Sequence, residues 1–187
     1  MGQDARVRYT KRVIKESIID LLQEKPFHKI TLTEVCKLAE INRTTFYKYY
    51  KDLYDWKEQL EDECFQRTSA ILEQANIHNM KEVLTQQFRD MRDNAELYVL
   101  ISSPNFESKV LEQVISIILE KTDFESRQYL ALADEQDYRR KWNCYLIIYG
   151  CIGVIQCWID GGMRETPEKL AVYYMDCVQN YLFQMGK

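Results

Sequence analysis

The sequence is short of the residues that most often end a helix. Its 187 residues include only three prolines and six glycines. Because these two residues most often interrupt regular structure, so few of them favour long, continuous helices. With 46% hydrophobic residues, the chain can bury a real core, which excludes a disordered protein. It has room for one medium domain, or for a small domain joined to a larger one.

The sequence also lacks the residue groupings that carry most metal and catalytic chemistry. His28 and His78 are its two histidines, and neither has a second histidine or cysteine at helical spacing. The six cysteines form no C-x-x-C motif, and four lie in apolar helical stretches, where a reduced thiol packs as a small hydrophobe. We find no glycine-rich phosphate loop and no nucleophile beside a base. We therefore expect no metal, no cofactor and no enzyme activity.

One long segment without charge raises the question of a membrane span. Residues 142–159, WNCYLIIYGCIGVIQCWI, carry no charge over 18 positions, which is about the shortest length that spans a bilayer. Asn143, Gln156 and two glycines would be costly there, so a helix buried on most sides is the better interpretation. The opening MGQDARVRYTKR has no apolar segment after its basic residues, so no secretory signal is predicted. We expect a cytoplasmic protein without a membrane segment.

Charge is divided unevenly along the chain. Met1–Leu60 carries 12 Lys and Arg against 9 Asp and Glu, and Glu61–Lys187 carries 13 against 20. A positive head joined to a negative body indicates a polyanion bound at the head. Ordinary surface charge explains the same numbers equally well, so this observation leaves both alternatives open.

Local signals divide the head into three short helices. The spacing of Ile14, Ile18 and Leu21 predicts a first helix from near Thr10 to the residues before Pro26. Residues 31–34, TLTE, have the form of a capping box and predict a helix over 32–39. The residues expected to face inward from it are Leu32, Val35 and Leu38. Asn42 is an equally good cap for a helix over 43–49. Two short helices joined by a tight turn suggest a helix-turn-helix.

The second helix of such a pair carries residue types that suit a DNA groove. In a helix-turn-helix the second helix lies in the major groove and the first crosses the backbone. The side chains expected to face outward are Arg43, Thr44, Thr45, Tyr47 and Lys48, with Phe46 returning to the core. Arg43 can bind guanine, the threonines can meet base edges, and Tyr47 and Lys48 can hold phosphates. Each of them taken alone on a helix would more often be a solvated or half-buried surface residue.

These residues carry a family resemblance. The segment 31–52, TLTEVCKLAEINRTTFYKYYKD, resembles the DNA-binding signature of TetR-family transcriptional regulators, over about residues 8–59. Two positions depart from the pattern. Glu40 replaces the usual glycine of the turn, which costs roughly 1 kcal/mol if its backbone is left-handed. Leu53 replaces the lysine that often opens the fourth helix, so that phosphate contact would be absent or would pass to Lys51.

The resemblance implies an all-α fold with two parts. An N-terminal three-helix helix-turn-helix DNA-binding domain would cover residues 1–51. A larger helical ligand-binding and dimerisation domain would cover 52–187, with the helix 52–75 as connector. The implied DNA-binding residues are Thr31, Thr33, Asn42, Arg43, Thr44, Thr45, Tyr47, Lys48 and Lys51. The basic residues Arg6, Arg8 and Lys11 would form an arm that adds phosphate or minor-groove contacts, or a solvated tail.

The body is expected to join two heads. One head reads only a few base pairs, so specificity needs two heads about one helical turn apart, ~34–36 Å, held by a homodimer. Family members pair through their last two helices, and residues 149–168 resemble the C-terminal region of one TetR subgroup. The candidate interface residues are Gly150, Gly153, Trp158, Tyr174, Val178 and Tyr181, with packing inside one chain as the alternative.

The resemblance also implies regulation through the body. Family members are usually repressors of palindromic operators on double-stranded DNA, released by a small-molecule effector. The candidate ligand-binding aromatics are Tyr98, Trp142, Tyr145 and Tyr149, for each of which an ordinary core position is the alternative. The rival interpretation is a coregulator that works through a partner protein, because the Glu40 and Leu53 departures could mark a weakened DNA contact.

Overall fold

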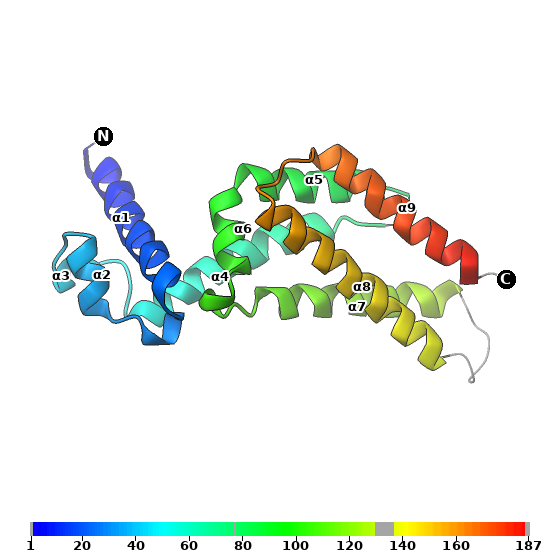
Figure 1. Ribbon diagram of the computed structural model, residues 1–187, viewed down its shortest axis with the longest axis horizontal. Coiled ribbons are helices and arrows are strands. Elements are labelled where there is room, and N and C mark those ends of the chain that lie inside the picture. Colours follow the sequence, from blue (N-terminus) through cyan, green and yellow to red (C-terminus); the bar gives the residue numbers. More distant parts are fainter. Residues whose placement is uncertain (1, 77, 130–136, 186–187) are drawn as a thin grey trace. The chain divides into compact units, whose positions relative to one another are not determined.

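The computed structural model describes residues 2–76, 78–129 and 137–185 as α-helices joined by short connections (Figure 1). The helices are α1 (Gly2–Glu24), α2 (Leu32–Leu38), α3 (Arg43–Phe46), α4 (Leu53–Leu72), α5 (Met80–Asp93), α6 (Ala95–Ser102), α7 (Val110–Tyr129), α8 (Asp137–Asp160) and α9 (Pro167–Met185). Two short 3-10 turns, η1 (Phe27–Lys29) and η2 (Pro104–Phe106), complete the order. Across these ranges no strand occurs, and the predicted all-α fold is confirmed.

The residues group into two compact units. The head unit contains Met1–Glu63 together with Leu100–Lys109, and the body unit contains Cys64–Val99 and Val110–Lys187. The second segment of the head unit is thus separated from the first by 36 residues of body. The division into domains 1–51 and 52–187 stays a prediction.

An aromatic cluster lies at the centre of the head unit. Phe27, Trp56 and Phe106 are all buried, and Phe106 is 0% exposed. The ring centroids of Phe106 lie 5.8 Å from Phe27 and 6.2 Å from Trp56, both in edge-to-face geometry. Edge-to-face pairs at these distances are favourable because the ring edge is positive and the ring face negative. Phe106, from the segment 100–109, therefore completes the core formed by residues of the first segment, 1–63.

Polar contacts fasten the same segment to the head unit. Asn105 Nδ2 donates to the Leu22 carbonyl at 2.8 Å, at the end of α1. Lys57 Nζ donates to the Glu107 carbonyl at 2.7 Å. The Lys57 ammonium also lies over the Phe106 ring, 5.1 Å from its centroid, where a cation is attracted to the ring face.

Three local expectations for the head need correction. The first helix begins at Gly2 and not near Thr10, so Arg6, Arg8 and Lys11 lie on α1 and do not form an arm. Leu38 is 52% exposed and does not face inward. On a helix as short as α2, the inward face is formed by Val35 with Cys36 and then Ala39, all of which are buried. The third helix ends at Phe46 and not at residue 49.

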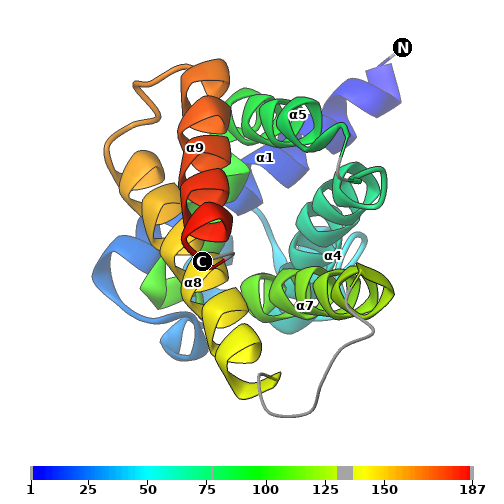
Figure 2. The same cartoon turned by 90° about the vertical axis from the view of Figure 1, so that its right-hand side faces the viewer.

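In the body unit, α9 runs along α5 (Figure 2). Phe88 of α5 is buried against two aromatic residues, with its centroid 5.9 Å from Trp158 of α8 and 5.1 Å from Tyr174 of α9. Arg89 Nη2 makes an ion pair of 2.6 Å with Glu168 at the start of α9. Apolar packing therefore joins α5, α8 and α9 within this unit.

The turn between α8 and α9 is built from residues that commonly end and begin helices. Gly162 has φ 77°, a left-handed conformation that glycine adopts without steric cost. Thr166 accepts a hydrogen bond from the Lys169 amide at 3.3 Å, and Pro167 opens the next helix. Trp158 Nε1 donates to the Glu165 carbonyl at 3.1 Å, which closes the turn over the indole ring.

The uncharged segment 142–159 of α8 is not buried on most sides. Trp142 and Leu146 of α8 are 67% and 65% exposed, and Tyr149 is more than half exposed. The expectation of a largely buried helix is therefore wrong for one face of α8. Of the helices that the structure describes, none has the length and apolar character needed to cross a membrane.

Candidate nucleic-acid interface

A capping box fixes the start of α2. Thr31 Oγ1 accepts a hydrogen bond from the Glu34 amide at 3.4 Å, and Glu34 Oε2 accepts one from the Thr31 amide at 2.9 Å. Lys25 Nζ lies 2.5 Å from Glu34 Oε1 and ties the end of α1 to this cap. The Lys25 hydrogen bond, followed by those from Thr31, lowers the pKa of Glu34 to about 2. The predicted box is present, and it carries a negative charge above that pH.

A second cap fixes the start of α3. Asn42 Oδ1 accepts from the Thr45 amide at 2.7 Å and from the Thr45 hydroxyl at 2.9 Å. Asparagine is among the best N-cap residues because its side chain satisfies an amide that has no helical partner. The predicted cap is therefore present. The Thr45 hydroxyl is also engaged in this cap, through its hydrogen bond to Asn42.

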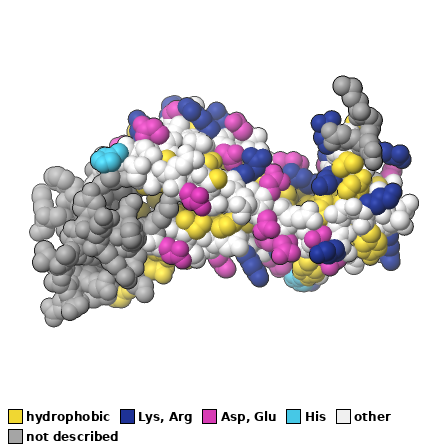
Figure 3. Space-filling model, turned by 180° about the vertical axis from the view of Figure 1, so that it is seen from behind, with side chains coloured by type: hydrophobic (Ala, Val, Ile, Leu, Met, Phe, Trp, Pro, Cys, Tyr) yellow, Lys and Arg dark blue, Asp and Glu magenta, His cyan; other side chains and the backbone are white. Residues whose placement is uncertain are grey.

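The exposed residues of α2 and α3 form one surface around a buried anchor. Phe46 is fully buried, 5.4 Å from Tyr50 between ring centroids, and so holds α3 against the core. Tyr47 is 55% exposed. The exposed residues of α2, α3 and the turn after α3 that were expected to contact DNA are here called the α2–α3 surface: Thr33, Arg43, Thr44, Tyr47 and Lys48. Figure 3 shows several Lys and Arg side chains on the head unit.

Arg43 makes a contact that the sequence did not predict. Its Nη2 atom donates to Thr33 Oγ1 at 2.6 Å, so the guanidinium bridges α3 and α2. Arg43 and Thr33 are ten positions apart, and only the packing of the two helices brings them together. The contact pre-positions a residue expected to read bases beside one expected to hold phosphate.

The turn between α2 and α3 has the backbone that favours glycine. Glu40 has φ 52°, in the left-handed region. The Ile41 amide closes the turn by donating to the Cys36 carbonyl at 3.0 Å. A glutamate in this conformation costs about 1 kcal/mol relative to glycine. The backbone strain expected for a left-handed Glu40 is therefore present.

The start of α4 is acidic. Asp52 Oδ1 accepts from the Asp55 amide at 2.8 Å, and Asp55 Oδ2 accepts from the Lys51 amide at 2.8 Å. Leu53 is buried in the head core. Lys51, two residues before α4, is exposed. The two carboxylates bound to these amides would repel a phosphate. They therefore weaken the phosphate contact that the resemblance implies at the start of α4.

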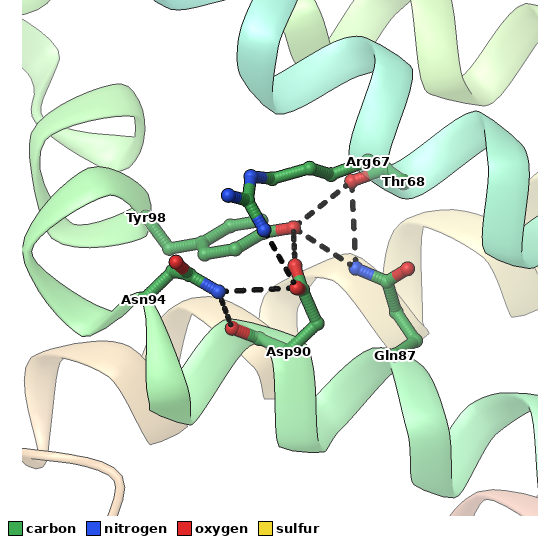
Figure 4. Close-up of polar contacts among 6 residues, drawn as sticks. All are labelled: Arg67, Thr68, Gln87, Asp90, Asn94 and Tyr98. Atoms are coloured by element: carbon green, nitrogen blue, oxygen red, sulfur yellow. Dashed lines mark hydrogen bonds and ion pairs between the residues drawn. The ribbon is translucent and has the colours of Figure 1, made fainter.

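Tyr98 lies in a polar cluster among α4, α5 and α6 (Figure 4). Its hydroxyl donates to Asp90 Oδ2 at 2.8 Å and lies 3.2 Å from Thr68 Oγ1. Asp90 Oδ1 accepts from Arg67 at 3.2 Å and from Asn94 at 3.0 Å. Burial raises the pKa of Tyr98 far above its usual range, so the phenol stays protonated and acts as donor. These bonds give Tyr98 a structural role inside the body.

The other expected ligand residues lie elsewhere. Trp142 and Tyr149 are exposed on α8, and Tyr145 stacks on Tyr149 with 6.2 Å between centroids. Tyr98 is on α6 and buried. Trp142 and Tyr149 are thus exposed where Tyr98 is buried, and none of the four lines the groove described below.

The expected dimer residues separate into two groups. Gly150 and Gly153 are exposed on α8, and a Cβ atom added to either would meet nothing within 4 Å. Trp158 and Tyr174 are buried against Phe88 within one chain, so their side chains belong to the core and not to a surface. The side chains of Val178 and Tyr181 lie outside the described part of the structure.

An open groove lies between α8 and α9. It encloses about 320 Å³ and is lined by Leu146, Ile147, Gly150, Cys151, Val154, Tyr173, Tyr174 and Cys177. The Tyr174 hydroxyl donates to the Cys151 carbonyl across its floor. Sequence reasoning did not single out Leu146, Cys151, Tyr173 or Cys177. The spacing of 146, 150 and 154, which repeats every four residues on α8, was the available signal.

Among the side chains described, no three His, Cys, Asp or Glu residues gather closely enough to hold a metal ion.

Comparisons with known proteins place the chain in a family. Residues 78–180, more than half of the chain, match TetR_C_8, the transcriptional regulator C-terminal region. The HTH-type dhaKLM operon transcriptional activator DhaS of Lactococcus lactis subsp. lactis (strain IL1403) is 25% identical over 126 residues. That match covers 62% of this chain and 65% of the relative, which is slightly less than two thirds of its length.

Two solved structures have a similar fold. A TetR transcriptional regulator from Streptococcus agalactiae 2603V aligns with a TM-score of 0.56 and 23% identity, covering 95% of this chain and 98% of that one. The dihydroxyacetone kinase operon activator DhaS aligns with a TM-score of 0.51 and 19% identity, covering 94% and 95%. At these identities the two likenesses show the fold alone. The family and the relatives are transcriptional regulators and not enzymes. The chain belongs to the TetR family of transcriptional regulators.

Proposed function

We propose that this regulator binds a specific DNA operator as a homodimer, with the α2–α3 surface of each copy in a major groove. The observation that carries the proposal is the capped helix pair itself. Buried Phe46 anchors α3 while Arg43, Thr44, Tyr47 and Lys48 remain exposed beside it. This is the arrangement in which one short helix can enter a groove and present its first turn to base edges.

The contacts within the head refine the role of each residue. Arg43 and Thr44 are proposed to contact bases, and Tyr47, Lys48 and Lys51 to contact phosphates. The Thr31 hydroxyl is used in the cap, where it donates to Glu34 at 2.7 Å. The phosphate contact expected at the start of α2 is therefore assigned to Thr33. Asn42 and Thr45 serve mainly to hold α3, with the Thr45 methyl group left for a base contact.

A second copy of the chain is proposed to cover the exposed face of α8. Trp142, Leu146, Tyr149 and Gly153 recur at spacings of four, three and four, which aligns them along one side of the helix. Three large apolar side chains on one exposed stripe are unusual for a monomer surface. Gly150 and Gly153 leave space for a partner backbone or side chain. A two-fold dimer buries the same stripe on both copies and provides the two heads that an operator needs.

The direction of regulation has two candidates. Repression of a palindromic operator, relieved by an effector, is what the family resemblance implies. The relative from L. lactis is named a transcriptional activator, which supports activation. A promoter fused to a reporter, with and without the chain, separates the two, because the signal falls for a repressor and rises for an activator.

A protein partner is the second candidate for the regulatory input. The four aromatic residues proposed for a small-molecule site are dispersed, and Tyr98 is engaged with Asp90 and Thr68. The exposed aromatic residues of α8 instead offer a surface for a macromolecule. A stoichiometric complex of the DNA-bound chain with a second protein would support this candidate.

DNA binding at rising salt tests the main proposal. Binding of the full chain to duplexes from the region upstream of its own gene is measured between low and moderate salt. Because each neutralised phosphate adds about −0.9 to the log–log slope, several contacts give a slope of several units. Tyr47→Phe and Lys48→Ala should weaken binding to all duplexes to a similar extent, whereas Lys81→Ala, an exposed lysine of α5, should not. Absence of binding at low salt, or a slope near zero, would refute the proposal.

A further inference from the structure

The groove between α8 and α9 has a cysteine in each wall. Cys151 of α8 and Cys177 of α9 both line this cavity, and both are free thiols. The remaining lining residues carry no charge. The proposed operator binding leaves this pair of thiols without a function.

A hydrogen bond joins the two walls of the groove near the cysteines. The Tyr174 hydroxyl donates to the Cys151 carbonyl, which joins this turn of α9 to this turn of α8. Cys177 follows Tyr174 by three residues, so the two side chains lie on the same face of α9. Interaction with the Cys177 side chain raises the pKa of Tyr173. The two cysteine residues therefore border the same groove.

The two thiols differ in their surroundings. Burial raises the pKa of Cys151 to about 11, and the charge of a nearby Cys177 thiolate acts in the same direction. Cys177 is exposed. A peroxide in solvent reaches an exposed thiol first, so Cys177 is the nucleophile that reacts with it and Cys151 the thiol that closes the disulfide.

We propose that Cys151 and Cys177 form an oxidisable pair, which a peroxide converts to an intramolecular disulfide between α8 and α9. The Cys177 thiolate attacks one peroxide oxygen, the O–O bond breaks, and Cys177 becomes a sulfenic acid while hydroxide leaves. The Cys151 sulfur then attacks the sulfenic sulfur, and the displaced hydroxyl leaves as water with the Cys151 proton. Two thiols and one hydrogen peroxide thus give one disulfide and two waters.

The disulfide would change the surface that the proposed dimer uses. A disulfide holds its two Cα atoms roughly 4.4–6.8 Å apart, so it draws α8 toward α9 and narrows the groove. This consequence rests on the proposed homodimer, whose α8 face shares Leu146 and Gly150 with the groove. Oxidation should then weaken the dimer, and it should proceed more slowly at chain concentrations where the dimer covers the thiols.

The three other cysteines whose side chains the structure describes supply matched controls. Cys157 is exposed on the same helix as Cys151 but does not line the groove. Cys36 and Cys64 are buried in the cores of the head and body units. A reaction that depended on exposure alone would therefore modify Cys157 as readily as Cys177.

Peptide mapping of the oxidised full chain tests the pair. The folded chain is treated with hydrogen peroxide, alkylated in denaturant and digested without reduction. We expect one linked pair of peptides containing Cys151 and Cys177, in the natural sequence and in Cys157→Ser alike. Cys151→Ala should instead leave a Cys177 sulfenic acid that dimedone traps, and Cys177→Ser should yield no link. Linkage through Cys157, or oxidation of Cys157 with the pair still reduced, would overturn the proposal.

Sedimentation of the reduced and oxidised chain over a range of concentrations tests the coupling to the dimer. We expect the dimer dissociation constant to rise about tenfold or more on oxidation and to recover with dithiothreitol. A disulfide without any change in the dimer would overturn the coupling. A reduced chain that is monomeric at every concentration would overturn the proposed homodimer, while the peptide map would still decide the thiol pair.

Discussion

Arg43 donates from Nη2 to Thr33 Oγ1 at 2.6 Å, and this hydrogen bond joins the two helices of the proposed DNA surface. Arginine has five N–H donors in a fixed planar arrangement, so one bond to Thr33 leaves the others for a ligand. A guanidinium held in this way loses less conformational entropy on binding a base than a free side chain loses. The contact therefore supports Arg43 as the residue that reads bases.

Arg43→Ala should relax sequence preference at one position of the operator. A bidentate contact to one base is worth about 1–3 kcal/mol of discrimination, and that discrimination is lost with the guanidinium. The measurement is competition of single-base operator variants against the operator itself. Arg12→Ala removes an exposed arginine of α1 and serves as control. Equal loss of affinity for the operator and for random DNA would show that Arg43 contacts only phosphate.

The pair of Lys25 and Glu34 should make head stability depend on pH in a defined window. The Lys25 hydrogen bond lowers the pKa of Glu34 from 4.5 to about 2. A lowered pKa in the folded state stabilises the fold above the unfolded value, and this stabilisation is lost as the pH falls from 4.5 toward 2. Glu34→Gln keeps the hydrogen-bond acceptor of the cap and removes the charge.

The measurement is urea unfolding of both proteins at a series of pH values. The difference between the natural sequence and Glu34→Gln should be largest above pH 4.5 and should shrink as the pH falls toward 2. Glu58→Gln, at an exposed glutamate of α4, is the matched control. A difference that stays constant through this window would contradict the role assigned to the Lys25 contact.

Phe106→Ala should destabilise the head although residue 106 lies between α6 and α7. Phe106 is 0% exposed and packs on Phe27 and Trp56. Truncating a buried phenylalanine costs about 3–5 kcal/mol, because apolar contact is lost and a cavity remains. Hydrogen exchange of the α1 and α4 amides measures the effect within the head unit. Leu111→Ala, at a side chain that is 46% exposed, should change little. Unaltered exchange in α1 after Phe106→Ala would contradict a shared core.

Glu40→Gly should stabilise the chain by about 1 kcal/mol, because glycine adopts φ 52° without the clash that a Cβ atom causes. Replacing a glutamate by glycine inside a helix should instead lower stability. Glu58→Gly within α4 should cost about 1 kcal/mol, since glycine loses more backbone entropy there. Thermal unfolding of the two variants measures both changes in stability. A loss of stability on Glu40→Gly would indicate that the Glu40 side chain makes a favourable contact outweighing the strain.

The local features of the head were predictable because they depend on residues a few positions apart. Thr31 with Glu34 and Asn42 with Thr45 make caps through bonds across three residues, and such bonds form whatever the rest of the chain does. The end of α8 near Gly162 and the start of α9 at Thr166 also depend on residues a few positions apart. The segment 31–52 also carried the family resemblance, so fold class and family followed from the sequence.

Only the tertiary structure decided which apolar and polar side chains are buried, and against what. Phe106 enters the head core, whereas Leu38, at an apparently inward position of α2, is exposed. Trp158 turns into the core while Trp142 on the same helix faces outward, which the apolar sequence of α8 cannot distinguish. Burial depends on contacts between segments distant in the sequence, such as Arg43 with Thr33 or Tyr98 with Thr68. Periodicity specifies the faces of a helix, but the packing of the other helices determines which face is covered.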